Sequence, residues 1–381
     1  MSDLASRAAD LVDFASGALP EMQLADGLFC HELVAAGARE SGGRRGRGAR
    51  REERAVLGSS VRYSLICLLG LRRAERGDVA VPVDADRLER RILGLAPFDG
   101  LTAGELGLLL WALSRSGGDA DRVLGPLAAT LEGNRPYALE TLELCWATVG
   151  VLRALEAGIG NAAALTRLAD ELRGRLLARA ETASGLLLNS DGGRRSILPH
   201  FATGIYGVHA FATLGRLRSD DVALASAKRL ADGLIAARLP DAAWPWICDS
   251  RDGSVVEPYR LYSVHQDAMA PLALFELSEA TGEDRYGAAA VEGVEWVFGA
   301  NELGVSLLDR DAGVLYRSIN RRGFGDRAAL WGNSAAALTL GRPLVRDARR
   351  PEVERTDRPY HLGWILEAWC DRDLAAHEPS S

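Results

Sequence analysis

The sequence predicts an all-α fold, a closed toroid of six helical hairpins with short β-hairpins on one rim. Three observations lead to this prediction. From residue 59 onward, apolar residues recur at helical spacing almost without a break. Short and long connections alternate between the helices that this spacing defines. Three of those helices also begin with similar short sequences, an internal echo that indicates repeated units.

The helical spacing defines twelve helices in six consecutive pairs. They lie near residues 59–74, 85–94, 102–117, 120–133, 138–158, 161–181, 199–216, 220–238, 264–281, 283–300, 326–341 and 360–372. Connections within most pairs are very short, such as SGGDA, LRSDD and TGE, whereas those at 182–198, 239–263 and 301–325 are long. A closed ring of hairpins requires this alternation, because its short turns lie on one rim and its long loops collect on the other.

The similar helix starts are RPYALE at 135–140, LPHFATG at 198–204 and RPYHLGW at 358–364. Proline is tolerated in a first helical turn, because its missing N–H would have no partner there. Each proline is followed at once by Tyr or His, which is thereby presented at the helix mouth. Pro271 likewise restricts where its helix starts, near Asp267–Met269. The helices expected on the inner layer include those at 199–216, 264–281 and 360–372.

The long connections look like β-hairpins. The segments LLLNSDGGRRSIL, PWICDSRDGSVVEPYRLY and LGVSLLDRDAGVLYRSI each place a glycine-containing turn between apolar or alternating arms. Three such hairpins on one rim would form the walls of a cleft.

The first 58 residues are expected to form a separate N-terminal part, a helix and an Arg/Gly-rich loop, before a toroid domain at 59–381. The loop at 38–54 holds no aromatic residue that could stack on a base, so we interpret it as a solvated loop and not as a nucleic-acid arm. The acidic, amphipathic start of the chain does not have the features of a signal peptide.

Composition excludes several classes of function. The net charge of -7 provides no basic field for nucleic acid. No apolar run reaches the roughly 18 residues of a membrane span. Five cysteines without a CxxC pair indicate reduced thiols in a cytoplasmic protein. FCHE at 29–32 is a lone Cys–His pair and no nucleotide-binding glycine loop is present, so neither a metal nor a cofactor is expected.

The segment 244–267 concentrates hydrogen-bonding chemistry in an otherwise bland helical sequence. Tryptophan faces stack on the C–H faces of sugars, and carboxylates, imidazoles and phenols accept or move protons. The candidate catalytic residues are His265, Asp249, Asp267, Glu257 and Tyr262 from this segment, together with His200. A helix-capping role would explain Asp267 alone. The candidate substrate-binding residues of the segment are Trp244, Trp246, Tyr259 and Gln266.

Further candidates flank other helix starts and rim loops. The candidate binding residues there are Arg194, Tyr206, His209, Arg317, Arg321, Trp331, Asn333, Tyr360 and His361. Arg195, Asn320, Arg322, Tyr137, Glu140, Arg62 and Tyr63 are expected to contribute around the same rim. Arginine suits a carboxylate or phosphate. We therefore expect a saccharide or other small-molecule ligand, possibly an anionic one such as a uronate.

This rhythm of helix pairs and rim loops resembles the six-hairpin, or (α/α)6, toroids. The best-known members are carbohydrate-active: glycoside hydrolases, unsaturated-uronide hydrolases, polysaccharide lyases and sugar 2-epimerases. The resemblance covers about residues 59–372 and rests on helix count and loop rhythm, so it assigns no catalytic residue. It implies a cytoplasmic carbohydrate-active enzyme, a hydrolase, lyase or epimerase, with its cleft at the loop rim.

The reaction type stays open at this stage. Hydrolysis requires two carboxylates roughly 5–10 Å apart, for which Asp249, Glu257 and Asp267 are candidates. Elimination or epimerisation requires an acid and a base, for which the histidines and Tyr262 suit better. One alternative is a terpenoid-cyclase-like toroid, although VDADR at 83–87 is one Asp short of its acid motif. Another is a non-catalytic saccharide-binding or scaffold protein. The sequence leaves the oligomeric state open.

Overall fold

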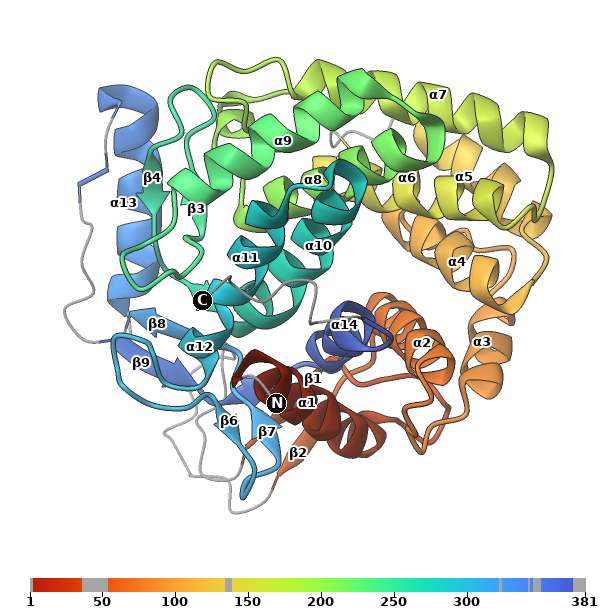
Figure 1. The fold of residues 1–381 in the computed structure, drawn as a ribbon, viewed down its shortest axis with the longest axis horizontal. Helices are drawn as coiled ribbons and strands as arrows, with labels where there is room; N and C mark the ends of the chain where they lie inside the picture. The colour runs from red at the N-terminus through yellow and green to blue at the C-terminus, as the bar shows by residue number, and fades with distance from the viewer. Residues whose placement is uncertain are drawn as a thin grey trace.

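Six helices form a closed inner ring, so the predicted toroid is confirmed. The computed structural model describes residues 3–35, 54–133, 139–321, 324–341, 343–344 and 351–372. The inner helices are α2 (Val61–Arg76), α4 (Ala103–Ser116), α6 (Thr141–Glu156), α8 (Phe201–Arg218), α10 (Ala270–Thr281) and α14 (Pro359–Trp369). Each inner helix packs against the next and α14 packs against α2, which closes the ring (Figure 1).

An outer helix covers each inner helix. The outer helices are α3 (Ala85–Leu93), α5 (Asp121–Glu132), α7 (Ala162–Arg179), α9 (Asp221–Ala236), α11 (Asp284–Glu292) and α1 (Asp3–Ala18). A short helix, α12 (Val294–Val297), extends the fifth hairpin. The three helices that we expected on the inner layer correspond to α8, α10 and α14, and all three lie there.

The sixth hairpin differs from the prediction. The helix predicted at 326–341 is α13 (Phe324–Leu340), and it packs against rim strands outside the ring instead of against α14. α1 packs against α14 in its place (Figure 1). Its buried residues Ala8, Leu11, Ala15 and Ala18 form a stripe at helical spacing, the pattern of a helix that covers a core. The proposed domain boundary at residue 58 stays a prediction, although α1 completes the ring.

Short strands line one rim. Two of the three predicted hairpins are confirmed, β3 (Ile247–Cys248) with β4 (Val255–Glu257), and β6 (Leu308–Asp309) with β7 (Val314–Leu315). The third was wrong, because 186–198 holds a short 3-10 helix, Arg194–Ile197, and no strand.

Two small sheets join segments that are far apart in the chain. One has the order β5 (Leu261–Tyr262), β8 (Ser318–Arg321) and β9 (Pro351–Glu354), and the other β10 (Thr356–Asp357), β1 (Glu32–Val34) and β2 (Ala55–Leu57). In the first sheet Tyr262 lies opposite Ser318, which lies opposite Glu354. This register brings loop residues from three segments to one side of the rim.

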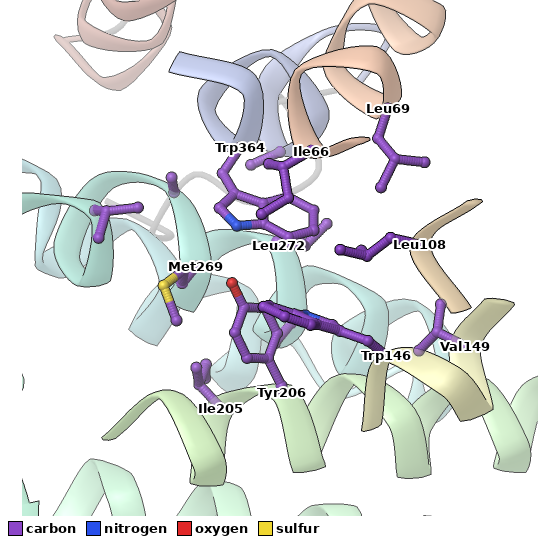
Figure 2. Packing of buried hydrophobic residues seen from close by; sticks show 14 of the residues in the cluster. Ile66, Leu69, Leu108, Trp146, Val149, Ile205, Tyr206, Met269, Leu272 and Trp364 are labelled. Carbon is purple, nitrogen blue, oxygen red and sulfur yellow. The ribbon is translucent and has the colours of Figure 1, made fainter. Parts of the chain in front are cut away.

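Glycines let the inner helices approach closely. A Cβ atom added to Gly150 of α6 would lie 1.9 Å from the carbonyl oxygen of Gly107 in α4, so these two backbones are in direct contact. Gly70 of α2 and Gly363 of α14 meet in the same way, at 2.3 Å. Large side chains from the ring fill its centre (Figure 2). Among the described residues, no helix is long and apolar enough to span a membrane.

Candidate active site at the amino-terminal rim

The first turns of the six inner helices meet at one rim. Contacts link each helix start to the next. Arg62 of α2 contacts Glu105 of α4 and Glu143 of α6, and Asn189 contacts Thr141 of α6 and Thr203 of α8. Phe201 of α8 contacts His265 before α10, Asp267 contacts His361 of α14, and Tyr360 of α14 contacts Tyr63 of α2. The amino end of a helix carries a partial positive charge, which favours anions and negatively charged oxygens. This rim therefore gathers both the polar side chains and the positive ends of six helices.

His265 begins a π-helical turn, His265–Met269, that leads into α10. Helical backbone already covers Ser263 and Val264, so the start expected near Asp267–Met269 was too late, whereas the helix predicted at 264–281 is confirmed. Its imidazole is buried, with ring centroids 4.7 Å from Phe201, 5.1 Å from Tyr262 and 6.0 Å from Trp246. Its Nδ1 atom has no partner among the described residues. Single π-helical turns are frequent at functional sites.

The imidazoles of His265 and His200 are held in the neutral form. Burial, followed by the charges of His200, His361 and Arg317, lowers the pKa of His265 to about 3. The ring of His200 stacks on Trp246 at 4.6 Å, and burial lowers its pKa from the ordinary value. A neutral imidazole can accept a proton at one nitrogen and donate a hydrogen bond from the other.

A third imidazole is paired with a carboxylate. Nε2 of His361 lies 2.7 Å from Oδ1 of Asp267, and both side chains are buried. The indole N–H of Trp369 donates to the carbonyl oxygen of Asp267 at 2.6 Å. Burial raises the pKa of the Asp267 carboxyl, while the charge and hydrogen bond of His361 act in the opposite direction. Asp267 makes no capping hydrogen bond, so the capping interpretation was wrong.

The other two candidate carboxylates are tied into the scaffold. Glu257 is fully buried, 2.6 Å from Arg321 and 3.0 Å from the amide of Asn333, and so joins β4, β8 and α13. Burial raises the pKa of Glu257, while Arg321 acts to lower it. Asp249 is buried in the β3–β4 turn and lies 2.6 Å from Arg251. The side chains of Glu257, Arg321, Asn333 and Asp249 therefore take part in contacts that hold segments of the rim in place.

Two more candidates from the 244–267 segment support the backbone. Gln266 is fully buried; its Oε1 accepts from the Trp244 amide N–H, and its Nε2 donates to the Tyr262 carbonyl. Trp244 is buried against Phe201, with ring centroids 5.1 Å apart. Tyr259 is half-buried beneath the guanidinium of Arg321.

The two candidates on α8 lie inside the ring. Figure 2 shows Tyr206 beside Trp146, with its hydroxyl directed toward Trp364; both indole rings lie within 5.8 Å of its ring centroid. Burial raises the pKa of Tyr206 well above its usual value. His209 lies deeper, against Trp111, and burial lowers its pKa to about 4. His209 is therefore away from the rim.

The arginines that we expected to bind an anion are dispersed. Arg317 is half-buried, with its guanidinium 5.0 Å from the ring centroid of Tyr262 and 3.2 Å from Glu354. Arg194 and Arg195 are exposed, and Arg195 lies over the indole ring of Trp331 at 4.2 Å. Asn320 also donates to Glu354, and Glu140 is exposed at the start of α6. The predicted contributions of Tyr137 and Arg322 lie outside the described residues.

The rim also contains a residue that the sequence analysis missed. The rings of His31, Tyr63 and Tyr360 form a continuous stack, with centroids 5.3 and 4.6 Å apart. Arg358 holds His31 in place, since its guanidinium donates to the His31 carbonyl at 2.6 Å. His31 was considered only as part of a metal motif, in a segment that we placed outside the toroid.

A cleft opens beside His200. It has a volume of about 290 Å³. Its lining residues include Asn189, Arg195, Leu198, His200, Trp246 and Trp331. His200 connects this cleft to the buried imidazole of His265, through the stack on Trp246. Among the described residues, no group of three His, Cys, Asp or Glu side chains could hold a metal ion.

Comparison with known proteins identifies relatives by structure alone. No protein-family model matches the chain, and no curated protein sequence matches it significantly. A D-mannose isomerase matches at 11% identity and a TM-score of 0.58, covering 97% of this chain and 97% of that chain. The cellobiose 2-epimerase from Bacillus thermoamylovorans matches at 9% identity and 0.58, covering 94% and 96%. A glycosidase in complex with glucose matches at 15% identity and 0.55, covering 97% and 98%. The chain therefore has the six-hairpin, (α/α)6 toroid fold that these enzymes share.

Proposed function

We propose that this protein is an enzyme that moves a proton at the carbon next to the carbonyl group of a sugar, as an aldose–ketose isomerase or a sugar 2-epimerase does. One observation carries the proposal. His200, His265 and His361 gather at the amino-terminal rim, whereas the candidate carboxylates Glu257 and Asp249 are bound to arginines of the scaffold. The imidazoles of the rim can transfer protons. Hydrolysis would need two free carboxylates, and Glu257 and Asp249 are instead paired with arginines.

The reaction divides into two proton transfers. One imidazole removes the proton from C2 of an open-chain aldose, which leaves an enediolate. Return of a proton to the opposite face of C2 gives the epimer. Delivery of the proton to C1, together with transfer of the O2 proton to O1, gives the ketose. His265 is our candidate for the base, because its Nδ1 atom has no hydrogen-bond partner among the described residues. His361 can carry the returning proton, because the carboxylate of Asp267 lies 2.7 Å from its Nε2 atom and orients the ring.

The rim also suits the negative charge that develops on the sugar oxygen. The amino ends of six helices contribute partial positive charge at this rim. Arg317 is half-buried within the electrostatic reach of His265 and adds a full positive charge. Fixed positive groups aimed at a developing oxyanion commonly lower an enzymatic barrier by several kcal/mol.

Two further lines of support point to a sugar. Trp246, Tyr63 and Tyr360 are half-buried aromatic side chains at the rim, and aromatic side chains commonly pack against sugar C–H groups. Structural relatives include a D-mannose isomerase and a cellobiose 2-epimerase. Hydrolysis is the second candidate, because a glycosidase that binds glucose is also among the relatives. An anionic sugar remains a narrower proposal, which now depends on Arg194, Arg195 and Arg317.

The proposed location is the cytoplasm. Five cysteines, at 30, 67, 145, 248 and 370, are free and buried. Free thiols are typical of proteins in a reducing compartment. Fractionation of cells that express the native gene would test this location.

Exchange with deuterated water tests the reaction. The wild-type protein would be incubated in D2O with D-glucose, D-mannose, D-fructose and cellobiose, and C2–H signals would be followed by NMR. We expect at least one aldose to lose its C2 proton signal as its epimer or ketose appears. Glycoside cleavage without any exchange at C2 would contradict the proposal and favour the hydrolase.

A further inference from the structure

We propose that Glu354 is a positioning residue: it holds the guanidinium of Arg317 at the amino-terminal rim, and turnover depends on Glu354 through Arg317. This inference rests on the proposed function, in which Arg317 adds positive charge near the developing oxyanion. Glu354 lies on β9 and Arg317 lies directly before β8, so neither residue belongs to a helix of the ring. Strand pairing outside the ring would thus set the position of a charge at the rim.

Arg317 is within electrostatic reach of side chains from two parts of the rim. Its guanidinium lies 5.0 Å from the ring centroid of Tyr262, a distance at which a cation is attracted to an aromatic face. Burial is the largest cause of the lowered pKa of His265 and of His31, and the charge of Arg317 contributes to both shifts. Burial acts to lower the pKa of Arg317 itself, whereas the phenols of Tyr262 and Tyr360 act to raise it. The position of this one charge therefore matters to several side chains of the rim.

The backbone of Arg317 is fixed on both sides, but its side chain is long. The N–H of Arg317 donates to the carbonyl oxygen of Thr356 at 2.9 Å. Its carbonyl oxygen accepts from the N–H and the hydroxyl of Ser263, at 3.0 and 2.9 Å. A free arginine side chain samples many rotamers, and ordering it costs conformational entropy. The position of the guanidinium therefore depends on what its nitrogen atoms contact.

Glu354 makes the contact that fixes the guanidinium. Nη1 of Arg317 donates to Oε1 of Glu354 at 3.2 Å, and the guanidinium makes no other hydrogen bond within the described part of the chain. The two side chains are only 21% and 12% exposed. Charges that are shielded from water attract each other more strongly than exposed ones. Glu354 is therefore the partner that orients Arg317.

The pairing of β8 with β9 in turn fixes Glu354. Glu354 lies opposite Ser318, and its Oε2 accepts from the Ser318 hydroxyl at 2.8 Å and from the Asn320 amide at 2.9 Å. Although burial acts to raise it, the charge of Arg317 and the hydrogen bonds of Ser318 and Asn320 lower the pKa of Glu354. The carboxylate is therefore ionised at neutral pH. One of its oxygens is held by β8, and the other holds Arg317.

The effect of position can be separated from the effect of charge. A fixed charge stabilises a developing oxyanion without reorganising during the reaction, and a guanidinium released from Glu354 would lose this advantage. Glu354→Gln also removes a negative charge that opposes Arg317, so charge alone predicts faster exchange in this variant. Loss of position predicts slower exchange. A fall in kcat would therefore report the position of Arg317.

The test is a double-mutant cycle. C2 exchange per folded molecule would be measured for the wild type, Glu354→Gln, Arg317→Met and the double variant, with the aldose that the wild type exchanges fastest. We expect Arg317→Met to lower kcat about 10²-fold. Glu354→Gln should lower kcat about tenfold while KM stays within about twofold. The double variant should match Arg317→Met alone, because a positioning residue has no effect once the group that it positions is removed. Arg317→Gln takes the place of Arg317→Met if that variant does not fold.

Glu352→Gln provides the matched control, because Glu352 is an exposed glutamate of the same strand, opposite Asn320. It should leave kcat and KM unchanged, and melting temperatures would verify that all variants fold. A wild-type kcat in Glu354→Gln or in Arg317→Met would overturn the positioning role while the proposed reaction stands. The same holds if Glu354→Gln lowers kcat by an equal factor with and without Arg317. Absence of exchange by the wild type with every sugar would overturn the proposed function and this inference with it.

Discussion

The two ends of the helical ring contain different kinds of buried polar residue. Near the carboxyl ends of the inner helices, Arg115 binds Glu367 through two hydrogen bonds, and Arg153 and Arg216 both bind Glu276. One buried atom there, Nε of Arg153, has no partner among the described residues. At the amino-terminal rim, by contrast, the unpartnered buried atoms include two that belong to groups that can accept a proton. These two are Nδ1 of His265 and Oδ2 of Asp267.

This difference separates stability from chemistry. Arginines in the last turn of a helix interact favourably with its dipole, and their carboxylate partners complete buried pairs. Unpartnered buried polar atoms cost free energy, so a fold retains them mainly where a ligand satisfies them. The carboxyl-terminal end therefore contributes buried arginine–carboxylate pairs to stability, and the amino-terminal end is where we propose that a substrate binds.

The largest expected effect is on stability. Glu276→Gln leaves the guanidinium groups of Arg153 and Arg216 without their shared buried carboxylate. Breaking a buried pair in this way costs about 3–5 kcal/mol of unfolding free energy. Urea denaturation would measure the loss, and the exchange rate per folded molecule should not change.

Glu156→Gln is the matched control for that variant. Glu156 lies 2.9 Å from Arg153 and 3.6 Å from Arg216, but its side chain is 43% exposed. An exposed pair contributes only about 0–1 kcal/mol. If the two variants lost equal stability, burial of the Glu276 network would not explain its contribution.

The pH dependence of stability provides a second test at this end. Although burial acts to raise it, the charges of Arg153, His209 and Arg216 lower the pKa of Glu276 from 4.5 to about 2. A carboxyl with a depressed pKa stabilises the fold above its unfolded value and loses that contribution as the pH falls toward its folded value. We expect this group to contribute on the order of 3 kcal/mol at neutral pH.

Stability curves between pH 6 and pH 2 would check the sign. The unfolding free energy of the wild type should fall from about pH 4.5 downward, and its advantage over Glu276→Gln should shrink in the same range. An advantage that stays constant down to pH 2 would mean that Glu276 titrates normally.

At the amino-terminal rim, the expected effect is on turnover. Asp267→Asn removes the carboxylate that lies 2.7 Å from His361 and orients its imidazole. We expect kcat for C2 exchange to fall about 10²-fold or more while KM changes little, because the sugar contacts remain. A variant whose kcat falls only in proportion to its loss of folded protein would make Asp267 a structural residue.

The sequence predicted the parts of this account that local patterns determine. Helical spacing of apolar residues predicted the ring of helices. The density of polar residues around Tyr262 and His265 predicted one of the helix starts at the amino-terminal rim. The side-chain pairs between distant segments could not be predicted in the same way. Asp267 meets His361 across 94 positions and Glu257 meets Arg321 across 64, so only the closed fold brings them together.

The missed outer helix has a related cause. We assumed that paired helices follow one another in the chain, and α13 was therefore assigned to α14. The ring closes instead through α1, from the other end of the sequence. His31 was overlooked for the same reason, because it reaches the rim through the strand pairing of β1 with β10.

The most direct test of the central claim measures two properties of two variants, His265→Gln and Glu276→Gln. For each, C2 exchange per folded molecule would be measured in D2O with the aldose that the wild type exchanges fastest, alongside the unfolding free energy in urea. We predict that His265→Gln loses about 10²–10⁴ in exchange rate but little stability. Glu276→Gln should lose about 3–5 kcal/mol of stability but keep its exchange rate. A folded His265→Gln variant that exchanges at the wild-type rate would contradict the account.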